Sequence, residues 1–282
     1  MKSNYRYIGR SKMEELCNLL FELSNEDRLV ILLQLKQNSM KISHISKKLN
    51  FTVQETSRNI SRLSETNLIQ RKGDGSFQLT AYGENVLNLL PGFEFLSKHV
   101  EYFTTHTLSR LPHEFFCRIG DLVECTYIGD PMLTFYEAEK MMDQAEEFLW
   151  LMSEQHLVSA LPHMKKALEN GSHLRGLLPK DLPFPEDYFE QESVKEYNQV
   201  EKQARSKGQL EERWIDRIDT AIGVADKMSG RVFFPTLEGH FDYRGFTVVD
   251  ECSHQYCKDL FIYYWNKAST TIPDHVLESY NR

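Results

Sequence analysis

Amide and guanidinium side chains recur along the segment from Val53 to Ser64 at the spacing of one helix face. At about 100° per residue, the polar side consists of Gln54, Glu55, Arg58, Ser61 and Arg62, with Asn59 on its flank. The opposite side is a narrow stripe of small and apolar residues, namely Val53, Thr56, Ser57, Ile60, Leu63 and Ser64. Glutamine and asparagine amides pair with adenine edges in the major groove, and arginine pairs with guanine. The pattern therefore predicts a helix that reads duplex DNA.

The residues around this helix fit a helix-turn-helix. Thr52 and Glu55 have the spacing of a capping box, which predicts that the helix begins at Val53. A preceding helix is expected over Ile42 to Leu49, and it carries Lys47 and Lys48 at its C-terminal end. Two explanations of these lysines stay open: they complement the helix macrodipole, or they contact phosphate.

A hairpin is expected directly after the second helix. Gly73-Asp-Gly75 separates two short alternating runs, which is a strong hairpin signal. Arg71 and Lys72 precede the turn, where the wing of a winged helix would reach a phosphate. The segment therefore predicts a winged helix-turn-helix.

The distribution of charge supports a polyanionic partner for this segment. Residues 1 to 90 hold 13 Lys and Arg against 9 Asp and Glu, a net charge of +4, whereas residues 91 to 282 hold 20 against 32, a net charge of −12. Phosphate neutralisation requires such a local basic excess. The predicted DNA-contacting residues are Lys47, Lys48, Thr52, Gln54, Thr56, Ser57, Arg58, Asn59, Arg62, Arg71 and Lys72. A winged helix that binds only another protein remains the alternative.

Two parts of the chain resemble known archaeal regulators. Residues 14 to 90 resemble the winged-helix domain of archaeal transcriptional regulators related to the ArsR and MarR types, most closely at FTVQETSRNISRL, Phe51 to Leu63. Residues 221 to 268 resemble the effector domain of the methanogenesis-regulator family, with the matching residues Pro235, Gly239, Asp242, Tyr243 and Trp265. The resemblance implies a transcriptional regulator whose second domain senses an undefined signal.

Size and patterning agree with two domains. The chain has 282 residues, of which 41% are hydrophobic and 26% charged, as is ordinary for a soluble globular protein. We expect an α+β winged helix-turn-helix domain over residues 1–90, followed by an α/β effector domain over 109–282. Residues 81–108 are expected to form a helical linker, with helices over 81–90 and 93–108 interrupted at Pro91-Gly92.

The second domain alternates short apolar runs with helical stretches, which favours a largely parallel sheet. The expected strands are 122–127, 147–152, 173–178, 220–225, 231–234 and 246–249, and the expected helices are 132–145, 155–169 and 253–267. Residues 182–207 are rich in Pro, Glu and Gln and are interpreted as a solvent-facing excursion or lid.

An apolar surface on the linker favours a homodimer. It consists of Val86, Leu89, Leu90, Phe93, Leu96, Val100, Phe103 and Leu108. DNA geometry also implies two copies, because successive major grooves lie about 34 Å apart. Packing of these residues within their own domain is the other explanation.

A small-molecule effector is expected where the strands of the second domain end. Arg175, Arg213 and His240 are the candidate polar anchors for this effector. The net charge of −12 on this part of the chain disfavours a large polyanionic ligand.

No catalytic function is expected. His163-Met-Lys165 followed by Asn170 imitates the H-x-K-x-x-x-x-D motif of phospholipase D, but Asn replaces the Asp and no second copy is present. A phosphodiesterase-like enzyme with a DNA-binding appendage remains the rival hypothesis.

No metal or cofactor is expected either. Cys252, His254 and Cys257 are close in sequence and could sense a metal or the redox state, but a zinc site usually needs a fourth ligand. Five scattered cysteines indicate reduced thiols, and no apolar run is long enough to span a membrane, so we expect a cytoplasmic protein without a membrane partner.

Overall fold

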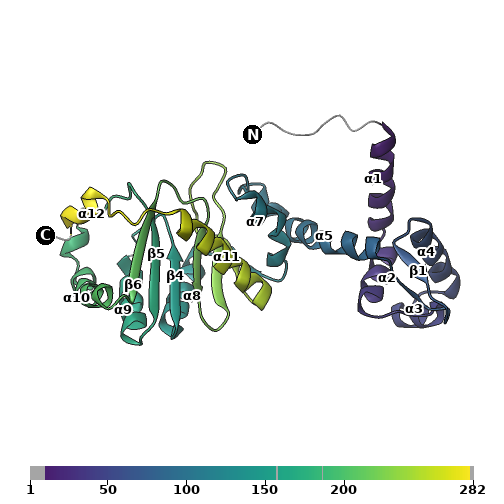
Figure 1. The fold of residues 1–282 in the computed structure, drawn as a ribbon, viewed down its shortest axis with the longest axis horizontal. Coiled ribbons are helices and arrows are strands. Elements are labelled where there is room, and N and C mark those ends of the chain that lie inside the picture. The colour runs from purple at the N-terminus through teal and green to yellow at the C-terminus, as the bar shows by residue number, and fades with distance from the viewer. Residues whose placement is uncertain (1–9, 157, 186, 280–282) are drawn as a thin grey trace. The chain divides into compact units, whose positions relative to one another are not determined.

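The structure is a computed structural model that describes residues 10–156, 158–185 and 187–279. The chain divides into two compact units, Met1–Leu90 and Pro91–Arg282 (Figure 1). Each unit is described by itself below. Among the described residues, no helix is both long and apolar enough to cross a membrane.

The first unit is a winged helix. Its elements are α1 Arg10–Leu23, α2 Glu26–Gln37, α3 Ile42–Leu49, α4 Val53–Glu65, β1 Ile69–Arg71, β2 Phe77–Leu79 and the first part of α5 Ala81–Lys98. Strands β1 and β2 pair antiparallel, and Met40 adds a bridge to Phe77. The core is formed by buried residues from α2, α3, α4, α5 and the wing, including Ile31, Leu32, Ile45, Ile60, Leu63, Leu68 and Leu87.

Local signals set the position of α4 as predicted. Thr52 Oγ1 accepts a hydrogen bond from the Glu55 amide at 3.1 Å, and the Thr52 amide donates to Glu55 Oε2 at 2.9 Å. These two bonds complete the capping box and confirm that the helix begins at Val53. Helix α3 ends at Asn50, whose φ of 58° is left-handed and turns the chain toward α4.

The second unit contains a seven-stranded sheet in the order β3-β9-β8-β7-β4-β5-β6. Its strands are β3 Thr126–Ile128, β4 Phe148–Met152, β5 His173–Pro179, β6 Leu210–Ile215, β7 Ala221–Ala225, β8 Ser229–Phe233 and β9 Gly245–Thr247. Only β4-β5 and β5-β6 pair parallel, and the other four pairs are antiparallel. The unit therefore combines helices with a mixed sheet. The prediction of a largely parallel sheet was wrong, because β7 joins β8 through a short turn and β8 joins β9 through a loop over residues 234–244, with no crossover helix in either connection.

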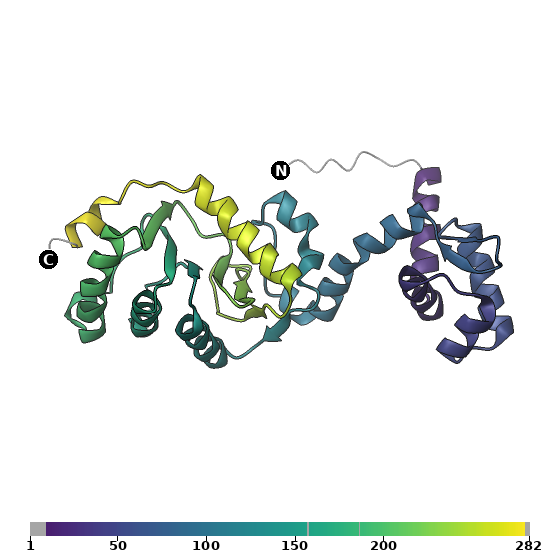
Figure 2. The same ribbon diagram turned by 60° about the horizontal axis from the view of Figure 1, so that its bottom comes forward.

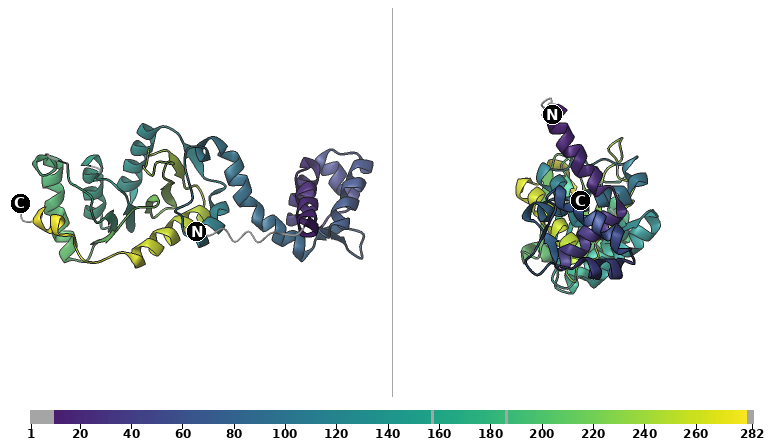
Figure 3. Two further views of the ribbon diagram at one scale, coloured as in Figure 1. Left: turned by 90° about the horizontal axis from the view of Figure 1, so that it is seen from above. Right: turned by 90° about the vertical axis from the view of Figure 1, so that its right-hand side faces the viewer.

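Helices cover both faces of this sheet (Figure 2). One face packs on α11 Glu251–Lys267, with α7 His113–Cys117 and the short helix η1 Ile119–Leu122 beside it. The other face packs on α8 Pro131–Gln144, α9 Leu161–Glu169 and α10 Glu192–Ser206, which lie side by side in Figures 2 and 3. The remaining helices of the unit are α6 Val100–Phe103, η2 Val158–Ala160, η3 Tyr188–Glu190 and α12 Asp274–Ser279. Two separate cores result, one on each face.

Three sequence predictions for this unit need correction. The excursion expected over 182–207 contains α10, and β6 follows it. The composition of α10 is mostly polar, but Val194, Tyr197 and Ala204 form a buried stripe at helical spacing. The strand expected over 122–127 begins only at Thr126, because the chain is still in η1 at Leu122. The helix expected over 155–169 begins with η2 at Val158.

The predicted break at Pro91-Gly92 is absent, and α5 runs without interruption from Ala81 to Lys98. A proline in a helix removes one backbone hydrogen bond and usually kinks the helix. Here the backbone of Gly120 packs directly on this point: a Cβ at Gly120 would lie 2.7 Å from the Gly92 nitrogen and 2.8 Å from Pro91 Cβ. We infer that this close contact supports the helix at Pro91.

Gly83 in α5 provides a test of the packing in the first unit. Alanine normally stabilises a helix relative to glycine by about 1 kcal/mol, but a Cβ at Gly83 would lie 2.1 Å from the Leu68 carbonyl oxygen, a backbone atom that cannot rotate away. We therefore predict that Gly83→Ala lowers the free energy of unfolding by about 1–3 kcal/mol. Urea titration measures the change. The control Gly73→Ala has open space around it and should stay within about 0.5 kcal/mol of the wild type.

Candidate nucleic-acid interface

The outer face of α4 presents polar side chains that are not used within the fold. Gln54, Ser57 and Arg58 are exposed, and Asn59 is half-buried. Among the described residues, none of these four side chains forms a hydrogen bond or ion pair. The inner stripe of the helix is Thr56, Ile60 and Leu63, all buried. The helix therefore has free donors and acceptors on one side and is anchored on the other.

Two of the predicted contact residues, Thr56 in α4 and the N-cap residue Thr52, have structural roles. Thr56 is fully buried, and its Oγ1 donates to the Thr52 carbonyl at 2.9 Å. This burial removes Thr56 from the set of residues that can touch a ligand. The Thr52 hydroxyl is used by the capping box, although the residue itself is exposed.

Arg62 is held by a buried carboxylate. Glu22 in α1 is only 3% exposed, and its Oε1 lies 2.5 Å from Arg62 Nη2 while its Oε2 lies 2.8 Å from Arg28 Nε. Both guanidinium groups also lie over the Phe21 ring, at 5.4 and 5.5 Å from its centroid. The hydrogen bond to Glu22 raises the pKa of Arg62 further. Arg62 thus links α4 to α1, and it is less available for a base than Arg58.

The wing has a defined turn with two exposed basic residues before it. Asp74 Oδ1 accepts from the Ser76 amide at 3.0 Å and from the Ser76 hydroxyl at 2.6 Å, which lowers the pKa of Asp74. Gly75 takes the left-handed φ of 82° that this turn requires. Arg71 and Lys72 are exposed, as are Lys47 and Lys48 at the end of α3. All four side chains are free to contact phosphate.

The predicted effector residues lie away from the cavity in the second unit. Arg175 on β5 and Arg213 on β6 face α11, where both guanidinium groups lie over Trp265 at 5.2 and 4.5 Å from the ring centroid. Arg213 Nη1 also donates to the Trp265 carbonyl at 2.8 Å. His240 is exposed and lies in a turn, where its backbone carbonyl accepts a hydrogen bond from the Thr236 amide at 2.8 Å. These contacts give Arg175 and Arg213 a structural role in packing α11.

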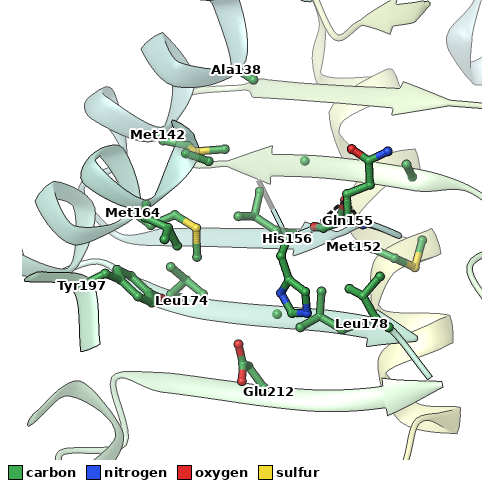
Figure 4. A pocket seen from close by; sticks show the side chains of 18 of the residues that line it. Ala138, Met142, Met152, Gln155, His156, Met164, Leu174, Leu178, Tyr197 and Glu212 are labelled. Atoms are coloured by element: carbon green, nitrogen blue, oxygen red, sulfur yellow. Dashed lines mark hydrogen bonds between the residues drawn. The ribbon is translucent and has the colours of Figure 1, made fainter. Parts of the chain in front are cut away.

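A cavity of about 420 Å³ lies on the opposite face of the sheet, under α8, α9 and α10. Figure 4 shows part of its lining, including Met142, Met164, His156, Tyr197 and Glu212. Ser153 after β4 and Pro179 at the end of β5 line the cavity, in keeping with a ligand site where strands end, but sequence reasoning missed the rest of its lining. The available signal was a single glycine inside each of two strands, Gly176 in β5 and Gly223 in β7, because an isolated strand glycine often marks a close approach of a ligand or backbone.

Four of the five residues that resemble the methanogenesis-regulator motif lie in the loop between β8 and β9, and the fifth, Trp265, lies on α11. The Pro235 carbonyl accepts from the Thr107 amide at 2.9 Å, and Asp242 Oδ1 lies 3.1 Å from His106 Nε2. Gly239 has a φ of 93°, and a Cβ there would lie 2.5 Å from Arg110 Nη2. Tyr243 follows Asp242 and lines the cavity. The motif thus connects the loop before α7 with the cavity wall.

The candidate catalytic pair does not converge. His163 and Lys165 lie on helix α9, where two residues of separation turn side chains about 200° apart. His163 Nδ1 lies 2.9 Å from Asp143 of α8, whereas Lys165 Nζ lies 2.8 Å from Glu196 of α10. The two side chains therefore do not hold one phosphate between them.

The cysteine cluster of α11 is also dispersed. Cys252 is exposed, Cys257 is fully buried in the core, and His254 Nε2 is engaged by the Ala225 carbonyl at 2.7 Å. Burial raises the pKa of the Cys257 thiol, which keeps it protonated. Within residues 10–156, 158–185 and 187–279, no group of three His, Cys, Asp or Glu side chains is placed to hold a metal ion.

Comparison with known proteins identifies the first unit. The family model for a winged helix-turn-helix matches residues 28–98. No curated protein matches the chain. Among solved structures, the chain is similar to TrmBL2, described as an archaeal chromatin protein with a novel mode of DNA binding, at 15% identity and a TM-score of 0.41, over 93% of this chain and 100% of that one. At this level the similarity carries no argument about function.

The ion pair between Arg62 and the buried Glu22 should stabilise the first unit. Removing one guanidinium leaves the buried Glu22 carboxylate poorly compensated, so Arg62→Met should lower the melting temperature of the first unit's transition. In a Glu22→Gln background the same substitution should have little effect, because the buried charge is gone. A double-mutant cycle followed by thermal denaturation measures this coupling. Additive losses would show that Arg62 and Glu22 do not depend on each other.

Proposed function

We propose that the chain is a homodimeric DNA-binding transcriptional regulator that reads the major groove with α4 and senses a signal through its second unit. The observation that carries the proposal is the free polar face of α4, with Gln54, Ser57 and Arg58 exposed and without partners among the described residues. A helix-turn-helix places its second helix in the major groove. This face has the amide and guanidinium groups that such docking uses.

Charge supports a nucleic acid over a protein partner for this face. Residues 1–90 carry a net charge of +4, although the whole chain carries −8. Lys47, Lys48, Arg71 and Lys72 flank α4 in sequence, and all are exposed. We propose that these four residues contact phosphates and that Gln54, Arg58 and Asn59 contact bases. Thr56 is excluded from base contact by its burial, and we leave Arg62 out of the proposed base contacts because its guanidinium is paired with Glu22.

A stripe on α5 supports a dimer. Tyr82, Leu89 and Phe93 are 47%, 73% and 69% exposed and fall within about 40° of one another around the helix. Large apolar side chains exposed in one row are typical of a helix that pairs with a second copy. Of the eight residues first expected to form this surface, Leu89, Phe93 and Val100 are exposed. Val86 and Leu108 are instead buried in the cores of the first and second units, and Leu90, Leu96 and Phe103 pack against these cores. Two copies would present two α4 helices to successive major grooves.

The second unit is proposed as a sensor and not as an enzyme. Its cavity is lined mostly by apolar side chains, which suits binding of a small molecule. The separated directions of His163 and Lys165 disfavour phosphodiesterase chemistry. We propose a cytoplasmic location for the regulator, since its partner would be duplex DNA.

Substitutions on α4 and the wing should affect DNA binding differently. Arg58→Ala should weaken binding to the cognate duplex by about 1–3 kcal/mol and leave random duplex nearly unchanged. Lys72→Ala should weaken both equally and reduce the salt slope by about 1. Cognate fragments are first selected from genomic DNA, and competition binding is then measured at two salt concentrations. Lys207→Ala, an exposed lysine of the second unit, is the charge-matched control. Equal losses on both duplexes for Arg58→Ala would contradict base reading.

Substitutions in the exposed apolar stripe of α5 test the proposed dimer. Leu89→Glu and Phe93→Glu each place two like charges at the proposed interface, and the dimer dissociation constant should rise by about a hundredfold or more. Sedimentation velocity measures the mass of each variant over a range of concentrations. Leu237→Glu changes an equally exposed leucine elsewhere and should leave the mass unchanged. A monomeric wild type would contradict the proposed pairing.

A further inference from the structure

The floor of the cavity is one continuous row of residues across five strands. The pairing register aligns Arg231 of β8, Gly223 of β7, Leu151 of β4, Gly176 of β5 and Glu212 of β6. With strands about 4.8 Å apart, the row spans roughly 19 Å from Arg231 to Glu212. All five residues line the cavity. The floor therefore has a cation at one end and an anion at the other.

Gly223 and Gly176, the neighbours of Leu151 in this row, add no side chains to the floor. A Cβ at Gly223 would lie 3.0 Å from Met141 Cε, and a Cβ at Gly176 would lie 3.1 Å from Glu212 Cγ. The neighbours at these positions are thus side-chain atoms, and the Met141 methyl is the end of a flexible side chain that can move when a molecule enters. Glycine normally weakens a strand, so its use at both positions is explained by the space that it leaves.

Much of the wall above the floor is apolar and adaptable, although Lys195, Asn198 and Lys202 of α10 also line it. Four of the nine methionines line the cavity, namely Met141, Met142, Met152 and Met164. Methionine fills irregular spaces and adjusts to different ligands. His156, labelled in Figure 4, stacks on Phe184 with the ring centroids 4.4 Å apart. Burial lowers the pKa of His156 to about 4. The imidazole is thus neutral, and the wall adds no positive charge there.

Arg231 is a buried cation with incomplete compensation. It is 4% exposed, its Nη1 donates to the Thr134 carbonyl at 2.9 Å, and its closest carboxylate oxygen, Glu137 Oε2, lies 3.7 Å from Nη2. Arg231 Nε and Thr134 Oγ1, both buried, have no hydrogen-bond partner among the described residues. Burial lowers the pKa of Arg231 to about 10, so the group is still charged at neutral pH. Buried charges are normally paired, and a ligand anion would complete this one.

The opposite end of the row is acidic. Glu212 and Glu201 share Arg205, whose Nη2 lies 2.7 Å from Glu201 Oε1. Lys195 and Lys202, both on α10, also line the cavity. Tyr197 projects from α10 beside it (Figure 4), and its buried Oη has no hydrogen-bond partner among the described residues. On the floor itself, the cation Arg231 and the carboxylate of Glu212 thus lie at opposite ends.

We propose that this cavity binds an elongated, mainly apolar monocarboxylate, with its carboxylate on Arg231 Nε and Thr134 Oγ1 and its chain lying over Gly223 and Gly176 toward Glu212. A single negative charge matches the one cation at that end, and a phosphate dianion would lie close to Glu137 without a second cation. The role of this ligand as the effector of the regulator rests on the proposed function, whereas its binding involves the second unit alone.

Matched ligands of one chain length test the proposal on the full chain without DNA. Decanoate, decanol, decylamine and decyl phosphate are titrated by competition with a fluorescent fatty-acid probe. We expect decanoate to bind about tenfold to a hundredfold more tightly than decanol or decylamine, as one charge-assisted hydrogen-bonded pair would provide. Arg231→Met should remove this preference. Equal binding of decanoate and decanol by the wild type would overturn the proposal, and tighter binding of decyl phosphate would overturn the assignment to a monocarboxylate.

Two further variants separate the site from general effects on folding. Gly223→Val keeps every charge and fills the floor, so it should weaken decanoate binding about tenfold or more. Arg175→Met removes an arginine from the opposite face of the same sheet and should leave the preference for decanoate intact. A loss with Arg175→Met as large as that with Arg231→Met would contradict the site. Because no DNA is present, this result is independent of whether α4 binds DNA.

Discussion

The alternation of side chains along strands that are covered on both faces is the constraint on which the second unit depends. Each strand residue faces either α11 or the three helices α8, α9 and α10, and its neighbour faces the other side. In β5 this rule sends Arg175 toward Trp265 and Gly176 into the cavity. In β6 it does the same with Arg213 and Glu212. One position of register decides whether a charged residue supports packing or lines a ligand site.

The first unit follows the same logic with the helical period. Helix α4 buries Thr56, Ile60 and Leu63, and the residues between them are left on the outer face. Arg62 lies at the border of the two faces, and the buried Glu22 captures it. Arg58, one turn earlier, has no such neighbour. The difference between these arginines comes from α1, which is about forty residues away in sequence.

The sequence alone was sufficient to predict only part of this structure. Local signals were sufficient for α4, its capping box and the wing, because each depends on residues within a few positions of one another. The order of the strands, the mixed pairing and the burial of α10 depend on contacts between distant segments, and the sequence alone did not reveal them. The same limit applies to the sites. The exposed residues of α4 followed from periodicity, but the row from Arg231 to Glu212 exists only once five strands are in register.

Two buried charges in this chain illustrate how a structural group differs from one that is ready for a ligand. Glu22 has two guanidinium groups within 2.8 Å, and its charge is fully compensated inside the fold. Arg231 has one carboxylate oxygen at 3.7 Å, and its Nε is unpartnered among the described residues. Removing a charge from water costs free energy in both places. At Arg231, the anionic group of a ligand would offset part of that cost. The adjoining cavity offers the space for such a group, and the row of floor residues that begins at Arg231 continues from it across the sheet.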